Sequence, residues 1–435
     1  MDWLKIYQER VTTAEEAIKM VHPGNRIFMT GNVSVPQKLL DALIGYAPNL
    51  KDVELCHALT ICPGDYAKPG LEKHFRINPL FIGGNMRSAV WEGRADFTPV
   101  LLSQFPLLFK NGILPVDVAF ISVSKPDAHG YCSLGVEVGL TKTAAESAKV
   151  IIAEVNTQMP RTLGDSFLHV SRINHFVEVD YPIVELPQAA ENDAIVTKIG
   201  EIIADLIPDG ATMQLGIGGI PDAVLGFLHH KKDLGVHSEM ISDGVMDLVE
   251  AGVITNARKT LLPGKIVTGF VLGTRRLYTW LDNNPICEFR RTEWVNDPFN
   301  IARNYRQVAI NSAIEIDLTG QVCSDSIGPK LYSGVGGQLD FIYGASRSEG
   351  GVPIIAMPST NTMKDGTLVS KIVPMLKEGA GVVTSRNHVH YIVTEFGAAD
   401  MHGKTIRQRA TALIGISHPA FRDDLLKKAR ALNWL

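Results

Sequence analysis

Short apolar runs alternate with amphipathic stretches along almost the whole chain, and this alternation indicates the fold. Apolar residues at helical spacing fill stretches such as 196–206 and 420–431. Buried strands that alternate with helices are typical of mostly parallel sheets covered on both faces. We therefore predict an α/β fold. The apolar runs expected to form strands include residues 53–59, 116–123, 149–155, 265–272, 352–358, 381–385 and 390–397.

One unit of this pattern occurs twice in the chain. Gly31 and Pro36 stand between a short apolar strand and a helix, and Gly216 and Pro221 stand in the same way 185 residues later. A Pro/Gly stop and an apolar helix precede each strand, as helix start and stop signals predict. The first copy is expected to contain helix 14–21, strand 26–30 and helix 36–44, and the second helix 194–206, strand 211–215 and helix 221–231.

A second pair of similar segments supports an internal duplication. Residues 127–133 read DAHGYCS and residues 317–324 read DLTGQVCS, and each segment follows an apolar strand. Two landmarks that recur in the same order favour duplication over the chance similarity of glycine turns. We therefore predict two similar α/β domains with open, mostly parallel sheets, over residues 1–187 and 188–435.

Length and charge set the class of protein. A chain of 435 residues exceeds what one hydrophobic core usually supports, which also favours two domains. The hydrophobic fraction of 45% and the net charge of −4 are those of an ordinary globular protein. This charge argues against a general nucleic-acid surface and a polybasic membrane anchor. An anionic ligand must then be bound by backbone amides and a few placed cations.

The cysteines and the N-terminal residues predict a cytoplasmic protein. Five cysteines, an odd number without a CxxC pair, favour free thiols in a reducing compartment over a disulfide framework or a zinc site. The first twenty residues mix acidic and basic side chains, unlike a secretory signal peptide. No apolar run approaches the ~18 residues of a membrane span. We expect no membrane partner.

The stretch from Leu215 to Gly244 contains the strongest candidate for a site. Its turn Gly216-Ile217-Gly218-Gly219-Ile220-Pro221 lets a ligand approach the backbone, and the following helix N-terminus favours negative charge. A glycine-rich turn between strand and helix is also common without any ligand. A dinucleotide fingerprint requires glycine where Pro221 stands, so that alternative fits poorly.

Glu239 lies near the end of this stretch, just before an expected turn at Asp243-Gly244. At its ordinary pKa of ~4.3 a glutamate is ionised at neutral pH and can act as a nucleophile without a general base. Most single glutamates are instead solvated loop acids or helix caps. The small and apolar neighbours Ser238 and Met240 could desolvate this one.

A second glycine turn, at residues 333–341, favours a catalytic role for Glu239 over that of a solvated loop acid. Two such turns at strand ends can direct backbone amides at one oxyanion. Asn311 and Lys364 could add polar or cationic contacts, although an Asx turn and a solvated loop lysine explain them equally well. The glycines of this second turn that we expect to line the site are Gly334, Gly336 and Gly337.

Several of these segments resemble the acetyl-CoA hydrolase/transferase family, and within it the 4-hydroxybutyrate and butyrate CoA-transferases. The similar segments are GIGGIP, HSEMISDG, GVGGQLDF, SKIVPM, EFGAADMHGKT, FIGGNMRSAV and VSKPDAHGYCSLG, in the family's order over almost the whole chain. The resemblance implies a CoA-transferase-like duplication, with the active site between the two domains. It also implies a homodimer or homotetramer.

The resemblance assigns roles to residues. Glu239 matches the glutamate that becomes a glutamyl-CoA thioester, residues 216–220 match the CoA-binding turn, and Gly337 with its neighbours matches a second CoA contact. Asn311 and Lys364 match more loosely. The implied reaction is ping-pong transfer of CoA from 4-hydroxybutyryl-, butyryl- or acetyl-CoA to a short-chain acid such as acetate, with CoA as substrate and no tightly bound cofactor.

Two alternatives and two further residue groups remain open at this point. The alternatives are an acyl-CoA hydrolase on the same site and a dinucleotide- or sugar-phosphate-binding module without chemistry. Four arginines could contact CoA phosphates: Arg275, Arg276, Arg290 and Arg291. The His388-Val389-His390 and His229-His230 groups have no cysteine or carboxylate at ligand spacing, so we expect no metal.

Overall fold

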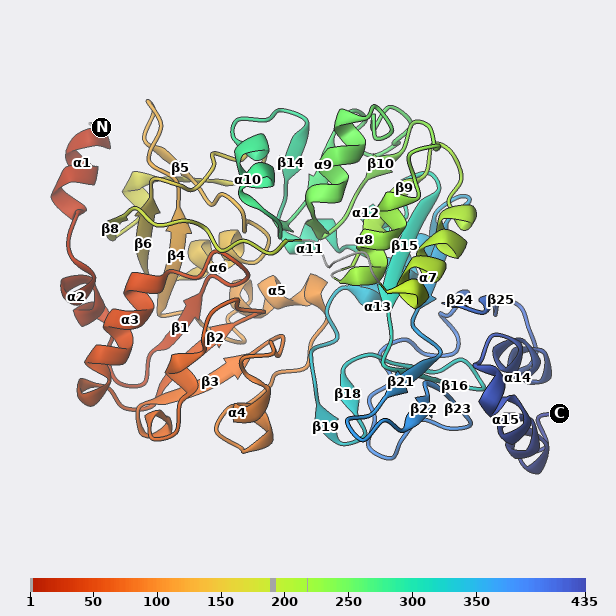
Figure 1. The fold of residues 1–435 in the computed structure, drawn as a ribbon. Coiled ribbons are helices and arrows are strands. Elements are labelled where there is room, and N and C mark those ends of the chain that lie inside the picture. Colours follow the sequence, from red (N-terminus) through yellow and green to blue (C-terminus); the bar gives the residue numbers. More distant parts are fainter. Residues whose placement is uncertain (1–2, 188–192, 217) are drawn as a thin grey trace. The chain divides into compact units, whose positions relative to one another are not determined.

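The structure, a computed structural model, describes residues 3–187, 193–216 and 218–435 (Figure 1). The chain divides into two compact units: unit 1 comprises Met1–Pro187 and Ile266–Val295, and unit 2 comprises Gln188–Lys265 and Asn296–Leu435. The first division coincides with the domain boundary expected after residue 187. Residues 266–295, which the sequence analysis assigned to the C-terminal domain, instead belong to unit 1.

Residues 266–295 belong to unit 1 because their backbone pairs with that unit. The Val271 N–H donates to the Val136 carbonyl at 3.0 Å, and the Phe289 N–H donates to the Leu163 carbonyl at 2.9 Å. Apolar runs carry no information about which sheet they join. The elements of this segment are β12 (Ile266–Thr268), β13 (Phe270–Val271), α10 (Arg275–Leu281), β14 (Cys287–Phe289) and α11 (Thr292–Val295).

Unit 1 is built around a six-stranded, wholly parallel sheet with the order β3-β2-β1-β4-β6-β8. Two of its interior strands, β2 and β4, are fully buried, as expected for a parallel sheet covered on both faces. The strands are β1 (Arg26–Met29), β2 (Val53–His57), β3 (Phe75–Pro79), β4 (Val118–Val123), β6 (Val150–Asn156) and β8 (His175–Val179), beside the short pair β5 (Tyr131–Ser133) and β7 (Phe167–His169). The helices are α1 (Trp3–Arg10), α2 (Ala14–Ala17), α3 (Gln37–Tyr46), α4 (Arg87–Trp91), α5 (Phe105–Lys110) and α6 (Thr141–Ser147).

Unit 2 is built around a sheet with the order β10-β9-β15-β20-β24-β25, which is parallel except for its last pair. Its strands are β9 (Thr212–Leu215), β10 (Gly235–Val236), β15 (Gln307–Ser312), β20 (Val352–Ala356), β24 (Tyr391–Thr394) and β25 (Gly397–Asp400). Its helices are α7 (Ala194–Leu206), α8 (Gly219–Gly226), α9 (Asp243–Glu250), α12 (Pro298–Ile301), α13 (Gln338–Arg347), α14 (Ile406–Gly415) and α15 (Pro419–Ala431). Shorter strands are β11 (Met240–Ile241), β16 (Glu315–Asp317), β17 (Val322–Cys323), β18 (Ser326–Ile327), β19 (Lys330–Leu331), β21 (Thr360–Thr362), β22 (Leu368–Ser370) and β23 (Ile372–Val373).

The two sheets agree with the predicted duplication. The order β2-β1-β4-β6-β8 in unit 1 corresponds, strand by strand along the chain, to β10-β9-β15-β20-β24 in unit 2. The strand β3 of unit 1 has no counterpart at the outer edge of β10 among the described strands of that sheet. The two sheets therefore share one topology, and within the described residues the sheet of unit 2 has no strand that corresponds to β3.

The DAHGY and DLTGQ segments form the same turn in both units. The side chain of Asp127 accepts hydrogen bonds from the N–H groups of residues 129 and 131, at 2.9 and 3.0 Å. Asp317 accepts from residues 319 and 321 at the same two distances. Gly130 and Gly320 both have a positive φ, of 82° and 95°, which favours glycine. The two matching pairs of hydrogen bonds support the duplication.

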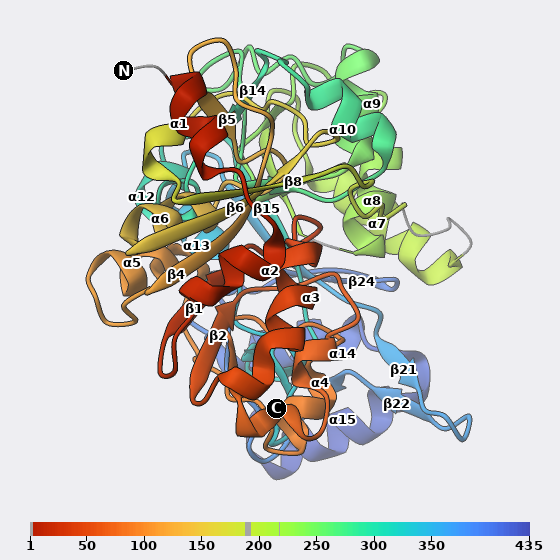
Figure 2. The same ribbon diagram turned by 90° about the vertical axis from the view of Figure 1, so that its left-hand side faces the viewer.

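The helix α7 packs against α8, the helix that follows the first glycine turn. Asp193 caps it by accepting from the N–H groups of residues 195 and 196, and its buried face includes Ile199 and Gly200. A Cβ on Gly200 would lie 3.0 Å from the Ala223 Cβ, so glycine allows α7 to pack closely on α8. The two helices lie side by side in both views (Figures 1 and 2).

Two predicted boundaries in this region are wrong. The helix expected over 221–231 is α8, which begins two residues earlier and ends at Gly226. Asp243 and Gly244, expected to form a turn, begin α9 instead. The apolar residues 245, 246 and 248 that follow are buried at helical spacing, and this burial outweighs the turn propensity of Asp-Gly. No helix in the described part of the chain is long and apolar enough to cross a membrane.

Candidate functional site

Glu239 lies in the short loop between β10 and β11, next to the C-terminal end of β9. The preceding Ser238 is fully buried, and its hydroxyl donates to the Leu215 carbonyl and accepts from the Leu215 N–H, both at 3.3 Å. Leu215 ends β9, and Gly216 follows it directly. The same hydroxyl therefore ties the Glu239 loop to the start of the glycine turn. Ligands of open α/β sheets bind at this C-terminal edge.

Two residues from a distant part of unit 2 meet the Glu239 carboxylate. The Asn296 side-chain amide donates from Nδ2 to Glu239 Oε2 at 2.8 Å. Gly337, just before α13, lies so close that a Cβ there would overlap Glu239 Oε2 and Asn296 Nδ2. Any larger residue at position 337 would displace the carboxylate. The structure thus brings together Glu239 and Gly337, both expected in the site, and adds Asn296.

Burial changes the acidity of Glu239. Desolvation raises its pKa to about 7, and the hydrogen bond from Asn296 lowers it in part. The assumption of an ordinary pKa is therefore corrected, because the sequence does not show how many protein atoms surround a side chain. A desolvated carboxylate is also a stronger nucleophile than a solvated one.

We expect the rate with limiting acyl-CoA to follow the ionisation of Glu239. Only the carboxylate can attack, so kcat/KM should rise about tenfold per pH unit below a midpoint near 7 and level off above it. The measurement is kcat/KM for acyl-CoA between about pH 5 and pH 9. A profile that is flat across this range would contradict an attacking Glu239 with a raised pKa.

The first glycine turn begins α8. Gly218 precedes the helix with a φ of 126°, a conformation that side chains other than glycine rarely adopt. The Gly216 N–H donates to the Ile310 carbonyl at 3.2 Å, which places this residue beside the end of β15. Gly218 is exposed, Gly219 is half-buried, Ile220 is buried, and Ile217 lies outside the described residues. The exposed glycine backbone is suited to contact with a ligand.

The second glycine turn precedes α13. Gly336 has a φ of 60°, and Gly337 leads directly into the helix, which the sequence analysis did not predict. Gly334 lies two residues before Gly336 in the same turn and is buried. The closest approach to Glu239 in this turn is made by Gly337.

Asn311 and Lys364 lie apart from Asn296 and Gly337, the two residues that meet the Glu239 carboxylate. Asn311 is buried on β15, and its amide pairs with that of Gln214 on β9, with Asn311 Nδ2 donating to Gln214 Oε1 at 3.0 Å. Lys364 lies exposed in the turn of the β21–β22 hairpin, which projects from unit 2 (Figure 2). The amide that does reach Glu239 comes from Asn296.

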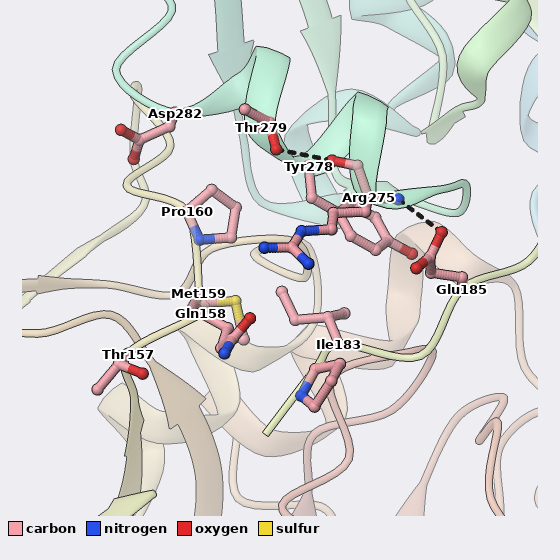
Figure 3. Close-up of a pocket in the computed structure, with 11 residues that line it drawn as sticks. Thr157, Gln158, Met159, Pro160, Ile183, Glu185, Arg275, Tyr278, Thr279 and Asp282 are labelled. Atoms are coloured by element: carbon pink, nitrogen blue, oxygen red, sulfur yellow. Dashed lines mark hydrogen bonds between the residues drawn. The ribbon is translucent and has the colours of Figure 1, made fainter. Parts of the chain in front are cut away.

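Three of the four arginines considered for CoA phosphates have distinct surroundings. Arg291 is paired with Glu146 and Asp165, and its neighbour Arg290 with Glu288. Arg275 extends into a pocket of about 380 Å³ in unit 1 (Figure 3). The lining residues of this pocket are Thr157, Gln158, Met159, Pro160, Pro182, Ile183, Glu185, Arg275, Tyr278, Thr279 and Asp282.

The charges in that pocket do not favour a phosphate. The two carboxylates, Glu185 and Asp282, outnumber the single guanidinium of Arg275. Glu185 accepts a hydrogen bond from the Arg275 backbone N–H at 2.9 Å (Figure 3). The pocket therefore gives no reason to prefer Arg275 among the four arginines. Among the described residues, no group of three His, Cys, Asp or Glu side chains is arranged to hold a metal ion.

Asn296 is the residue that sequence reasoning missed. It stands in Val295-Asn296-Asp297-Pro298, where Asn, Asp and Pro together indicate a turn. Asp297 indeed caps α12 by accepting from the Phe299 N–H at 2.9 Å. Asn296 itself is fully buried, and in the described part of the chain its Oδ1 accepts no hydrogen bond. Only the folded structure shows that this buried amide points at the Glu239 carboxylate.

A desolvated carboxylate beside an amide donor and two glycine turns, at the C-terminal edge of a parallel sheet, is the arrangement of an acyl-transferring enzyme. Comparison with known proteins identifies the family. Residues 1–189 match the acetyl-CoA hydrolase/transferase N-terminal domain, and residues 273–429 match the acetyl-CoA hydrolase/transferase C-terminal domain. The chain belongs to the acetyl-CoA hydrolase/transferase family.

Individual relatives are similar over nearly the full length. The chain is 53% identical to the 4-hydroxybutyrate coenzyme A transferase of Clostridium kluyveri, over 98% of this chain and 99% of that protein. It is 49% identical to the succinyl-CoA:acetate/propanoyl-CoA:succinate CoA transferase of Fasciola hepatica, over 96% and 87%. The crystal structure of a 4-hydroxybutyrate CoA-transferase from Porphyromonas gingivalis matches with a TM-score of 0.85 at 39% identity, over 99% and 100%.

Proposed function

We propose that this protein is a CoA-transferase that works through a glutamyl-CoA thioester on Glu239. The observation that carries the proposal is the Glu239 carboxylate itself, which is half-buried, accepts a hydrogen bond from Asn296 and lies directly against Gly337. Membership of the family and the full-length similarity to named CoA-transferases support it. A nucleophile, a fixed donor and a backbone turn are the parts that acyl transfer needs.

The first half-reaction moves CoA onto the enzyme. The Glu239 carboxylate attacks the acyl-CoA carbonyl carbon. The C–S bond then breaks and CoA leaves as the thiolate, which gives a mixed anhydride between the acyl group and Glu239. The thiolate then attacks the glutamyl carbonyl carbon and expels the free carboxylate. The product is a glutamyl-CoA thioester. An incoming carboxylate reverses these steps and leaves as its CoA ester.

Asn296 is proposed to stabilise the transition state of the second step, in which CoA thiolate attacks the carbonyl carbon of Glu239. When thiolate attacks the glutamyl carbon, negative charge collects on the carbonyl oxygen of Glu239. Asn296 already donates to Oε2 at 2.8 Å, so this donor needs no reorganisation as the charge develops. The backbone of the turn at Gly337 lies beside the same oxygen and can add to this stabilisation.

The first glycine turn is the proposed contact for CoA. Gly218 and Gly219 leave the backbone open at the N-terminus of α8, where negative charge is favoured. Asn311 and Lys364 are retained as weaker candidates for CoA contacts. No tightly bound cofactor is required, because CoA is the group transferred.

The proposed donors are 4-hydroxybutyryl-CoA, butyryl-CoA or acetyl-CoA, and the proposed acceptor is a short-chain acid such as acetate. The names of two relatives support this range: one acts on 4-hydroxybutyrate, and the other uses succinate, propanoate and acetate. We also propose that the protein is a cytoplasmic homo-oligomer. The position of the active site between two domains stays a prediction.

Transfer and hydrolysis differ in their need for an acceptor. We expect butyryl-CoA to be turned over repeatedly only when acetate is present, with acetyl-CoA and butyrate then formed in equal amounts and with ping-pong kinetics. The measurement follows CoA, acetyl-CoA and butyryl-CoA by chromatography with and without acetate. Release of free CoA at the same rate without acetate would establish the alternative, an acyl-CoA hydrolase on this site.

A further inference from the structure

The strand that leads to the proposed nucleophile is an edge strand. β10 pairs only with β9 in the sheet of unit 2, within the described residues. Gly235 and His237 donate their N–H groups to the carbonyls of Ala211 and Met213, at 2.8 and 3.0 Å. Neighbouring residues of a strand point to opposite sides, so the N–H and C=O of Val236 point to the open edge. Buried backbone groups there need partners.

Unit 1 solves the same problem with another strand. Its corresponding strand β2 is flanked by β3 through five parallel residue pairs, from Val53–Phe75 to His57–Pro79. In unit 2 this side of β10 has a single bridge, between Leu234 and Ile254. The ladder stops one residue before β10 begins.

Two side chains continue the ladder where the strand is missing. Asn256 Oδ1 accepts from the Val236 N–H at 2.9 Å, and Lys259 Nζ donates to the Val236 carbonyl at 2.7 Å. Both side chains are buried. Asn256 and Lys259 thus occupy the positions that a neighbouring strand would take along Val236, three residues before Glu239.

Lys259 is an unusual residue for this position. It is 3% exposed and makes no ion pair with any described carboxylate, and burial lowers its pKa to about 7. Room for its side chain depends on Gly235, where a Cβ would lie 2.5 Å from Lys259 Cγ. An amine without a counter-charge is costly to bury, and an apolar side chain of equal length would avoid that cost. The reason for a lysine at this position must therefore lie in its two hydrogen bonds.

The second hydrogen bond of Lys259 reaches the point where the chain leaves unit 2. Nζ donates to the Lys265 carbonyl at 2.6 Å, and Ile266 is the first residue of the segment that belongs to unit 1. One amine therefore holds both the strand that precedes Glu239 and the last residue before the chain crosses between units.

We propose that Lys259 is a positioning residue for Glu239: it completes the open edge of β10 and fixes that edge to the crossover at Lys265. This inference rests on the proposed function, because it assigns Lys259 to the nucleophile of that reaction. Lys259 does not touch the substrate. Its loss should therefore slow the steps at Glu239 and leave the binding of CoA largely unchanged.

The test compares Lys259→Met with the wild-type protein. Methionine keeps much of the apolar stem and removes the donors, so we expect slower formation of the glutamyl-CoA adduct, with kcat reduced by up to about 10²-fold and KM for acyl-CoA within about twofold. Adduct formation is followed by rapid quenching and mass spectrometry of the Glu239 peptide. Lys232→Met, which removes an exposed lysine of the same unit, is the matched control and should behave as wild type.

A second variant keeps the test valid if Lys259→Met does not fold. Gly235→Ala retains the amine but pushes on Lys259 Cγ, and we expect the same loss of kcat in a smaller amount. A folded Lys259→Met protein with a wild-type rate of adduct formation would overturn the inference, as would a change confined to KM. Absence of the adduct in the wild-type protein would instead overturn the proposed function.

Discussion

Glu239→Gln is expected to abolish CoA transfer. The amide has nearly the shape of the carboxylate and can keep the contact with Asn296, but it cannot attack a thioester carbonyl. Removing a covalent nucleophile costs several orders of magnitude, and we expect a loss of at least about 10⁴-fold in kcat. The measurement is transfer between butyryl-CoA and acetate under saturating conditions, together with CoA binding by calorimetry.

Two controls separate loss of the nucleophile from loss of the fold. Binding of CoA should persist in Glu239→Gln, because the first glycine turn is unchanged. Glu239→Asp keeps a carboxylate but withdraws it by one methylene, so it should retain a small part of the activity. Transfer at a rate near wild type in Glu239→Gln would rule out a covalent role for this residue.

Asn296→Ala is expected to reduce kcat by about 10²–10³-fold, the usual effect of losing one oxyanion donor. Asn296 donates to Glu239 Oε2 at 2.8 Å, on the oxygen that carries charge when thiolate attacks the glutamyl carbon. The same hydrogen bond lowers the pKa of Glu239, so the midpoint of the pH profile should move upward. Both quantities come from one series of rate measurements across pH.

Asn304→Ala is a matched control for Asn296→Ala. Asn304 is also a fully buried asparagine of unit 2, and its amide donates to the Ile301 carbonyl at 3.4 Å, within its own segment. Its replacement should lower the thermal stability without a shift in the pH midpoint. If Asn296→Ala has the kcat and the pH profile of wild type, the amide has no part in catalysis.

Much of the fold could be predicted because local patterns decide it. The repeated Gly31/Gly216 units and the paired Asp127 and Asp317 turns follow from short segments, and the structure contains both pairs. The assignment of residues 266–295 to unit 1 could not be predicted, since it depends on backbone pairing with residues more than a hundred positions away. The start of α9 depended on burial of apolar residues after Asp243.

The site was predictable to a lesser degree. Glu239 and Gly337 were singled out by their glycine turns and by resemblance to the family, and they meet in the structure. Asn296 could not be found, because its surroundings indicate an ordinary turn and its partner is 57 residues away in the sequence. The raised pKa of Glu239 and the role proposed for Lys259 follow from burial, which no sequence pattern reports.

The most direct test of the central claim is mass spectrometry of the protein after incubation with butyryl-CoA alone. The account predicts one CoA mass, less water, on the peptide that contains Glu239, and its disappearance when acetate is added. The unmodified peptide from a protein that still transfers CoA, together with an active Glu239→Gln variant, would contradict it.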